Sequence, residues 1–381
     1  MIKIPVYRPS LGGNERKYVN ECLDSTWISS KGRFIAEFET RFAGYLGVQH
    51  AASVSNGTVA LHLALVALGI GPGVEVIVPT LTYIAPVNAI AYTGATPIFV
   101  DSVPDTWQMD PEDVRRKITS RTRAILAVHV YGHPCDLSTL SAIAKEYDLL
   151  LIEDCAESFG SRYEGRHTGT YGDIATFSFF GNKTITTGEG GMVVTNNETL
   201  HERVCHFKGQ GLARYREYWH DVIGYNYRMT NICAAIGLAQ LEQADSFIAR
   251  KRQLAAWYLD ALTDSTVGFH QPHGDVLHTH WMCSILVSHP AEREPLRAEL
   301  AAAGIETRPV FSPVHSMPMY SQRFRKYPVA ESLGRRGINL PSYPDLTRNQ
   351  VGEIAAVICR GKWQQEPRDA MAVSVAQTSP G

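Results

Sequence analysis

The chain has 381 residues, of which 44% are hydrophobic and 19% are charged, and its formal net charge is -2. This composition is typical of a globular protein, and it excludes the strong overall basic charge that attracts nucleic acid. The length exceeds what one hydrophobic core usually spans, so we expect two packed units. An anionic ligand would have to be held by a local site.

The cysteine pattern and the N-terminus indicate the compartment. The seven cysteines are odd in number and scattered, and no Cys-x-x-Cys pair occurs. This pattern favours reduced thiols over a disulfide framework or a metal site. The first ten residues, MIKIPVYRPS, lack the apolar core of a signal peptide, and no run of about 18 apolar residues occurs. We therefore expect a cytoplasmic protein that binds neither membrane nor nucleic acid.

Between about residue 45 and residue 200, apolar strands alternate with amphipathic helices. A helix is predicted over 58–70, because its apolar residues follow helical spacing after the turn-forming Ser-Asn-Gly. Another is predicted over 138–148, and four apolar runs predict buried strands at 74–79, 96–101, 123–132 and 149–156. This alternation predicts an α/β fold whose mostly parallel sheet has helices on both faces and binds ligands at the carboxyl ends of its strands.

The pattern changes from about residue 245 onward. Two amphipathic helices and a short strand are predicted there, at 247–263, 294–304 and 281–287. We expect a large α/β domain with the N-terminal segment over 1–244 and a smaller α+β domain over 245–365. Residues 366–381 are small and polar without periodicity, and we expect a disordered tail.

Two predicted strand ends carry groups that suit a ligand. Gly57 and Thr58 open a helix, so their backbone N–H groups lie at the positive end of its dipole and suit an anion of phosphate size. The alternative is a plain helix N-cap. Asp154 ends the strand predicted at 149–156, with Glu157 three residues later. An aspartate in this position is often only a helix cap.

Lys183 stands alone among aromatic residues and glycines, in the stretch TFSFFGNKTITTGEGGM at 176–192. A bend at Gly181 would bring the Ser178 hydroxyl and the lysine amine to the two ends of one ligand. A lysine withdrawn from water has a lowered pKa and forms Schiff bases, whereas the alternative is an exposed hairpin lysine.

A fourth stretch, GYNYRMTN at 224–231, carries Asn226 and Arg228, or is simply a polar loop before a helix predicted at 232–243. Together, the four features suit a ligand with a phosphate, a ring nitrogen that pairs with a carboxylate, and an aldehyde that reacts with an amine. Pyridoxal 5'-phosphate has all three groups, and its enzymes hold it through a lysine and an acidic partner of the ring nitrogen.

Motifs spread over roughly residues 5–363 resemble those of one known family. They are STWISSKGRFIAEFE (25–39), SNGTVALHLAL (55–65), PTLTYIAPVNAI (79–90), VHVYGHPCD (128–136), IEDCAESFG (152–160), FSFFGNKTITTGEGGM (177–192) and YNYRMTNICAAIGLAQLE (225–242). On these motifs the chain resembles the DegT/DnrJ/EryC1/StrS sugar-nucleotide aminotransferases. The resemblance implies fold type I of the pyridoxal phosphate enzymes, which is like that of aspartate aminotransferase.

The resemblance also implies roles for the residues that match family motifs. Lys183 would bind the cofactor and act as catalytic base, Asp154 would keep the ring nitrogen protonated, and Glu157 would lie beside the 3-hydroxyl. Tyr83 would stack on the ring. Phosphate would be bound by Gly57, Thr58 and Ser178. Asn226 would reach the cofactor of the partner subunit, because the family forms homodimers with active sites at the interface.

The implied reaction is transfer of an amino group from L-glutamate to a keto-sugar nucleotide, with pyridoxamine 5'-phosphate as the intermediate form of the cofactor. Residues 177–192 and 218–231 look most like the branch that acts at C4 of GDP-4-keto-6-deoxymannose. Another sugar nucleotide, carried by dTDP or UDP or with a 3-keto group, remains an alternative. Some relatives that dehydrate the sugar instead carry histidine at the position of Lys183, so the lysine favours amino transfer.

Substrate contacts are expected on the same resemblance. The stretch RPVFSPVHSMPMY at 308–320 would lie near the sugar, with Arg308 suited to phosphate oxygens. His315 is either a contact of this kind or an ordinary packed histidine. Arg228 would meet either the glutamate carboxylate or the nucleotide. Three residues would line the entrance: Trp27, Ser29 and Lys31.

Two other classes of protein share features with this sequence. A nicotinamide-dependent oxidoreductase needs G-x-G-x-x-G between a strand and a helix, whereas the nearest stretch, GIGPG at 69–73, follows a helix and contains a proline. No phosphate-binding loop with G-x-x-x-x-G-K spacing occurs at Lys183 either. A regulatory protein on the same fold that performs no catalysis remains the second alternative, although Lys183 and Asp154 are both present.

Overall fold

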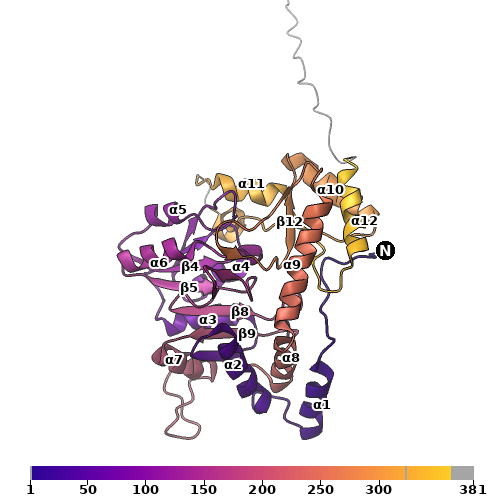
Figure 1. The fold of residues 1–381 in the computed structure, drawn as a ribbon. Helices are drawn as coiled ribbons and strands as arrows, with labels where there is room; N and C mark the ends of the chain where they lie inside the picture. Colours follow the sequence, from indigo (N-terminus) through magenta and orange to yellow (C-terminus); the bar gives the residue numbers. More distant parts are fainter. Residues whose placement is uncertain (1, 322–323, 362–381) are drawn as a thin grey trace, which may run out of the picture.

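The computed structural model describes residues 2–321 and 324–361, so the tail expected at 366–381 lies outside the described residues. Figure 1 shows a large α/β unit from which a long helix, α9 (Ala244–Ala261), leads to a second group of strands and helices. The division into domains at residue 245 stays a prediction. It assigns the N-terminal segment to the large domain, whereas the first residues of the chain pack with the second group. Ile4 pairs with Ile305 and belongs to its core.

The central sheet has the strand order β1-β9-β8-β5-β4-β2-β3 within the described residues. Its strands are β1 (His50–Val54), β2 (Glu75–Pro79), β3 (Thr96–Val100), β4 (Thr122–Val128), β5 (Leu150–Asp154), β8 (Ile174–Ser178) and β9 (Gly191–Thr195). In this sheet β9 runs antiparallel to both neighbours, whereas β3, β2, β4, β5 and β8 pair in parallel. The predicted mostly parallel sheet is confirmed. β9 reverses direction because a connection without a crossover helix joins it to β8.

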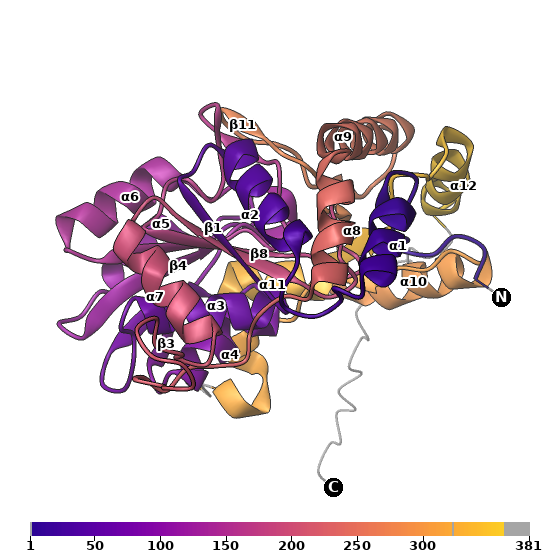
Figure 2. The same ribbon diagram turned by 90° about the horizontal axis from the view of Figure 1, so that it is seen from below.

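Helices cover both faces of this sheet (Figure 2). The helices of the large unit are α1 (Glu15–Ser25), α2 (Arg33–Leu46), α3 (Gly57–Ala67), α4 (Ile84–Tyr92), α5 (Pro111–Arg116), α6 (Leu137–Glu146), α7 (Glu198–Lys208) and α8 (Asn231–Leu241), of which α1 packs on α8. Val76 and Val78 of β2 share a core cluster with α3 and α4, whereas Ile77 between them belongs to the cluster of α5 and α6. Successive side chains of a strand point to opposite faces, so an unbroken apolar strand serves two helical layers.

The second group is built on an antiparallel sheet in the order β10-β12-β14-β13. Its elements are β10 (Gly268–Phe269), β12 (Cys283–Leu286), β13 (Arg308–Pro309), β14 (Gly337–Leu340), α10 (Arg293–Ala302), α11 (Pro328–Arg336) and α12 (Arg348–Cys359). A third sheet joins β11 (Val276–Leu277) to β6 (Arg162–Tyr163) and β7 (Arg166–His167). It therefore ties the second group to the large unit.

The predicted helices correspond to α3, α6, α8, α9 and α10, and the predicted strands to β2, β3, β4, β5 and β12. The strand predicted over 123–132 was too long, because β4 ends at Val128 and Val130–Gly132 forms a 3-10 turn. In that turn Tyr131 has a left-handed φ of 58°, and its N–H donates to the Glu157 carboxylate. No helix in the described ranges is long and apolar enough to span a lipid bilayer.

Candidate active site

A cavity of about 640 Å³ lies at the carboxyl ends of the central strands. β5 ends at Asp154, β8 ends at Ser178, and the turn after β8 carries Lys183. Parallel strands bring their carboxyl ends to one edge of a sheet, and residues from distant parts of the chain meet there. Seven predicted site residues line the cavity: Gly57, Thr58, Tyr83, Asp154, Glu157, Ser178 and Lys183.

The N-terminus of α3 forms one polar end of the cavity. Asn56 caps the helix through its Oδ1, which accepts the Val59 N–H at 3.0 Å, whereas the N–H groups of Gly57 and Thr58 have no acceptor among the described residues. A Cβ on Gly57 would lie 2.7 Å from the Ser178 Cβ, so only glycine lets the end of β8 come this close. Two N–H groups, a hydroxyl and the helix dipole then suit a phosphate.

The Lys183 amine lies inside the cavity. A turn places it there: the backbone N–H of Lys183 donates to the Phe180 carbonyl oxygen at 2.9 Å, and the bend expected near Gly181 is confirmed. Its Nζ lies 3.8 Å from Oε1 of Glu157. Burial lowers the pKa of Lys183, and the carboxylates of Glu157 and Asp154 oppose that shift without cancelling it. The alternative of an exposed hairpin lysine is therefore wrong.

Asp154 is a buried carboxyl group at the end of β5, in register with Val128 of β4 and Thr176 of β8. Its Oδ1 accepts the Ala156 N–H at 2.9 Å. Burial raises the pKa of Asp154, and the Ala156 N–H and Lys183 oppose the shift. A cationic ring nitrogen beside this carboxyl would favour its ionised form.

Aromatic side chains form one wall of the cavity. Tyr83 at the start of α4 is 58% exposed and lies 5.7 Å from the Phe311 ring centre. Tyr131 stacks between Phe311 and Trp281, with ring centres 5.0 and 6.1 Å away. The Trp281 ring centre lies 3.9 Å from the Lys183 Nζ. Sequence reasoning missed Trp281, because it appeared only as the first residue of a predicted strand.

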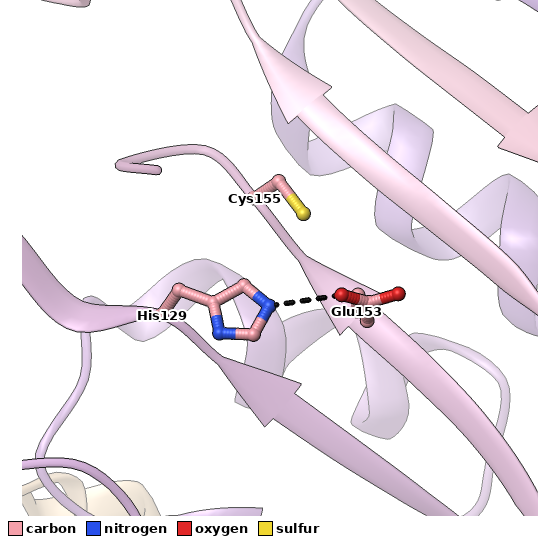
Figure 3. Close-up of side chains that lie close together, drawn as sticks. All are labelled: His129, Glu153 and Cys155. Atoms are coloured by element: carbon pink, nitrogen blue, oxygen red, sulfur yellow. Dashed lines mark hydrogen bonds and ion pairs between the residues drawn. The ribbon is translucent and has the colours of Figure 1, made fainter. Parts of the chain in front are cut away.

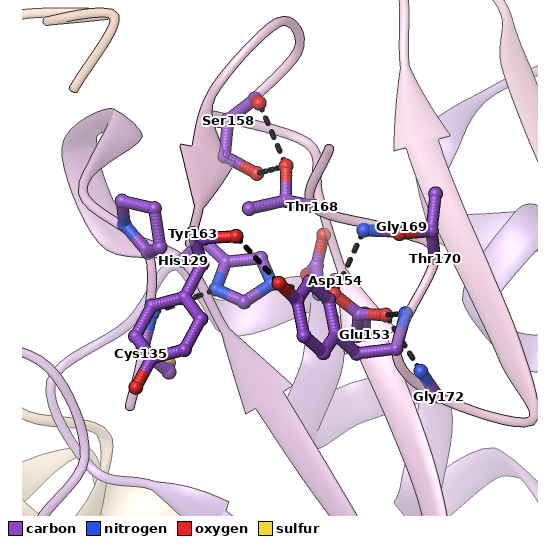
Figure 4. Close-up of polar contacts among 12 residues, drawn as sticks. His129, Cys135, Glu153, Asp154, Ser158, Tyr163, Thr168, Gly169, Thr170 and Gly172 are labelled. Atoms are coloured by element: carbon purple, nitrogen blue, oxygen red, sulfur yellow. Dashed lines mark hydrogen bonds and ion pairs between the residues drawn. The ribbon is translucent and has the colours of Figure 1, made fainter. Parts of the chain in front are cut away.

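A buried polar cluster supports the strand that carries Asp154. His129, Glu153 and Cys155 lie together there (Figure 3). The His129 Nδ1 accepts the Cys135 N–H at 3.0 Å, so its Nε2 carries the proton and donates to Glu153 at 3.2 Å. Figure 4 shows the Glu153 carboxylate also accepting N–H groups of the loop that ends at Gly172. The ligand atoms of His129 and Glu153 are engaged in hydrogen bonds, which indicates a structural role.

The remaining predicted site residues lie outside this cavity. Five of them are exposed: Trp27, Ser29, Lys31, Asn226 and Arg228. Arg308 is also exposed and pairs with Glu306 at 2.5 Å. His315 is buried, with its Nδ1 2.7 Å from the Thr80 hydroxyl and its Nε2 3.5 Å from Glu331. These contacts match the alternative in which His315 is an ordinary packed histidine.

A larger cavity, of about 950 Å³, lies elsewhere and is lined by several charged side chains. Arg116 and Lys117 pair there with Asp113, and Arg121 pairs with Glu75. Arg325 and Lys326 also line this cavity, and it shares no lining residue with the first one, so it lacks the combination of Lys183, Asp154 and the start of α3.

The residues of the first cavity suit pyridoxal 5'-phosphate. The Lys183 amine can meet an aldehyde, the Asp154 carboxyl a ring nitrogen, and the start of α3 a phosphate. Three cavity-lining side chains also carry buried polar atoms with no partner among the described residues: Thr82 Oγ1, Thr176 Oγ1 and Asn182 Oδ1. Buried polar atoms without partners are rare in proteins, and a polar ligand would satisfy them.

The fold and the site define an aminotransferase, and the chain belongs to the DegT/DnrJ/EryC1/StrS aminotransferase family, whose profile matches residues 9–359. This membership confirms the predicted family, and pyridoxal 5'-phosphate as the predicted cofactor. Among curated proteins, the chain is 67% identical over 348 residues to the GDP-perosamine synthase of Escherichia coli O157:H7, covering 91% of this chain and 95% of that protein. It is 50% identical over 359 residues to the GDP-perosamine synthase of Vibrio cholerae, covering 93% and 98%.

Solved structures confirm the fold. DesV of S. venezuelae, in complex with a ketimine intermediate, matches with a TM-score of 0.87 at 36% identity, covering 93% of this chain and 95% of that chain. The pyridoxal phosphate form of the putative sugar aminotransferase Spr1654 from Streptococcus pneumoniae matches with a TM-score of 0.89 at 28% identity, covering 94% of this chain and 98% of that chain.

Proposed function

We propose that this enzyme transfers the amino group of L-glutamate to C4 of GDP-4-keto-6-deoxymannose, giving GDP-perosamine and 2-oxoglutarate. The chemistry is carried by one observation, the Lys183 amine placed within a cavity that also presents Asp154 and the start of α3. The choice of sugar is supported by the high identity to relatives named GDP-perosamine synthase over nearly the whole chain.

Lys183 moves the protons of this reaction. Bound pyridoxal phosphate supplies a conjugated ring that accepts the electron pair released when a carbon next to the nitrogen loses its proton. Burial keeps a larger share of Lys183 unprotonated, so its Nζ can take the proton from the α-carbon of glutamate. In the second half-reaction the same Nζ delivers a proton to C4 of the sugar. Nitrogen leaves glutamate as the amino group and ends on the sugar.

The other cavity residues bind and orient. The Asp154 carboxylate would hold a proton on the ring nitrogen, and Glu157, beside Lys183, would face the 3-hydroxyl. The N–H groups at the start of α3 and the Ser178 hydroxyl would bind the phosphate. Tyr83, exposed at the cavity wall, would stack on the ring.

The site is completed by a second copy of the chain. The loop after α7 exposes large side chains, with Tyr218 93%, Ile223 90% and Tyr215 73% exposed, which favours burial in an interface. Asn226 follows directly in this loop and would reach the phosphate of the cofactor in the partner subunit. The other exposed candidates would contact substrate at that interface: Trp27, Ser29, Lys31, Arg228 and Arg308.

Mixing two inactive variants tests the shared site. A Lys183→Ala subunit paired with an Asn226→Ala subunit forms one active site with both defects and one with neither. Activity should therefore return on mixing and re-association, up to about half per mixed dimer. A mixture that stays inactive, although co-purification of two differently tagged subunits shows mixed dimers, would place Asn226 in its own subunit's site or in no site.

Substrate identity is tested with glutamate and three keto-sugar nucleotides, carried by GDP, dTDP and UDP. Formation of 2-oxoglutarate together with an aminated GDP sugar supports the proposal. Product with another carrier only would keep the aminotransferase and replace the sugar. No amino transfer with any of them would favour the regulatory alternative.

A further inference from the structure

Trp281 lies against the amine of Lys183, although the two residues are far apart in the chain. The Lys183 Nζ is 3.9 Å from the centre of the indole ring, which is buried. The indole Nε1–H donates to the carbonyl oxygen of Asn182 at 2.7 Å, in the residue directly before Lys183. The ring is therefore tied to the same turn that carries the amine, and this keeps its face toward Nζ.

Further hydrogen bonds fix the backbone around Trp281 and Lys183. Lys251 of α9 is completely buried, and its Nζ donates to the carbonyl oxygens of Trp281 and Ser342 at 3.0 and 2.9 Å. The hydroxyl of Tyr7, from the N-terminal segment, donates to the Lys183 carbonyl oxygen at 2.6 Å. Leaving any of these buried groups without a partner would be costly, so the network favours a single placement of indole and amine.

We propose that Trp281 is a positioning residue that holds the Lys183 ammonium against the face of its indole ring. This inference rests on the proposed role of Lys183 as the amine that binds the cofactor. The face of an indole is electron-rich and attracts a cation. Trp281 therefore stabilises the protonated form of Lys183 and keeps it in the site while it carries the substrate's proton.

Other charged groups also act on this amine. The Glu157 carboxylate lies 3.8 Å from Nζ, and Asp154 faces the same cavity, so both favour the ammonium as the indole does. The Nζ of Lys251 donates to the backbone carbonyl oxygen of Trp281, a bond that does not involve the indole ring. A substitution of the Trp281 side chain therefore changes the surroundings of Nζ without removing any of these charges.

The capture of pyridoxal phosphate by full-length protein stripped of cofactor tests the proposal without turnover. The aldehyde reacts only with the unprotonated amine, and the visible absorbance of the bound cofactor reports the reaction. Capture rates over a series of pH values give a midpoint that reports the proton affinity of Lys183. Trp281→Leu should lower this midpoint by about one pH unit, a tenfold loss of proton affinity, as expected for a desolvated cation–π contact. The midpoint of Trp281→Phe should fall between those of the parent protein and of Trp281→Leu.

Two controls separate the possible failures. Trp257→Leu removes an indole that lies 4.5 Å from the guanidinium of Arg250, and the midpoint should not move. Lys183→Ala should not capture the cofactor covalently. Capture by that variant would overturn the role of Lys183, and with it the proposed function.

An unshifted midpoint in both Trp281 variants, with slower capture at every pH, would show that Trp281 only fills space. If Trp281→Leu does not fold, the midpoint measured for Trp281→Phe tests the proposal by itself.

Discussion

The Lys183 Nζ lies 3.8 Å from Oε1 of Glu157, and both side chains are largely withdrawn from water. Burial raises the pKa of Glu157 to about 7, against the attraction of Lys183 and the hydrogen bond from the Tyr131 N–H. Burial also lowers the pKa of Lys183. Burial thus shifts the proton affinities of the two groups toward each other, compared with isolated residues.

Glu157→Gln should stabilise the cofactor-free protein and impair turnover. The folded pKa of Glu157 is raised above its unfolded value, so the folded state binds more protons between these two values and loses stability as pH rises through that window. Removing this cost should raise the free energy of unfolding by about 3 kcal/mol at about pH 8.

Urea unfolding of both proteins at several pH values checks this expectation. The gain of Glu157→Gln should shrink steadily on acidification toward about pH 4.5, where the unfolded carboxyl also binds its proton. A gain that is equal at all pH values would mean that the glutamine acts through packing.

Asp154→Asn should reduce amino transfer by roughly 10²–10³-fold, since an amide cannot hold a proton on the ring nitrogen through its charge. Cofactor should remain bound, because the contacts of Lys183 and of the α3 N-terminus are unchanged. Absorbance of the bound cofactor and single-turnover rates measure the two effects separately.

Asp148→Asn is the matched control for this change. Asp148 is exposed and has a left-handed φ of 53°, a conformation that asparagine tolerates well. Its variant should keep full activity. Equal loss of rate in both variants would contradict the role of Asp154.

Gly57→Ala should weaken cofactor binding. The new Cβ would lie 2.7 Å from the Ser178 Cβ, so α3 and β8 must separate and the phosphate donors lose their spacing. Equilibrium titration with pyridoxal phosphate should give at least about a tenfold higher Kd, which corresponds to a loss of 1.4 kcal/mol.

Gly44→Ala provides the comparison, because Gly44 lies within α2 and a Cβ there would meet nothing within 4 Å. It should leave the Kd unchanged and stabilise the protein by about 0.5–1 kcal/mol, since alanine favours the helix. Unchanged affinity in Gly57→Ala would mean that the phosphate lies elsewhere.

A cluster of buried histidines should make stability fall in mild acid. Burial lowers the pKa of His133 to about 4 and of His280 to about 3, and it lowers the pKa values of His270 and His278 well below the usual range. The rings contact one another, with 3.7 Å between the centres of His278 and His280.

The unfolded chain protonates these histidines near their ordinary pKa, so it binds more protons than the folded state as pH falls from about 6.5 toward 4. Stability should be lost through this window, by about 2 kcal/mol for each histidine at about pH 5. Unfolding of His278→Gln compared with the parent should give a shallower dependence on pH. An identical slope would contradict the cluster's role.

Much of the fold could be predicted because apolar runs and helical spacing are local properties. The strand that ends near Asp154 followed from such a run, and the polar residues after the predicted strands then had to meet at one sheet edge. The strand that ends at Ser178 was not predicted from the sequence. His315 shows the limit of this reasoning. Nothing in its neighbours distinguishes a ligand contact from a packed side chain, and only the fold brings it to Thr80.

By itself, the sequence determined part of the strands and helices and the reactive side chains that stand near their ends, because periodicity and composition are encoded within each segment. Only the tertiary structure decided that Trp281 and Tyr7 would close around Lys183. Those contacts join the N-terminal segment, the second sheet and the large unit, and they depend on how distant parts of the chain pack. Local patterns carry no information about that packing.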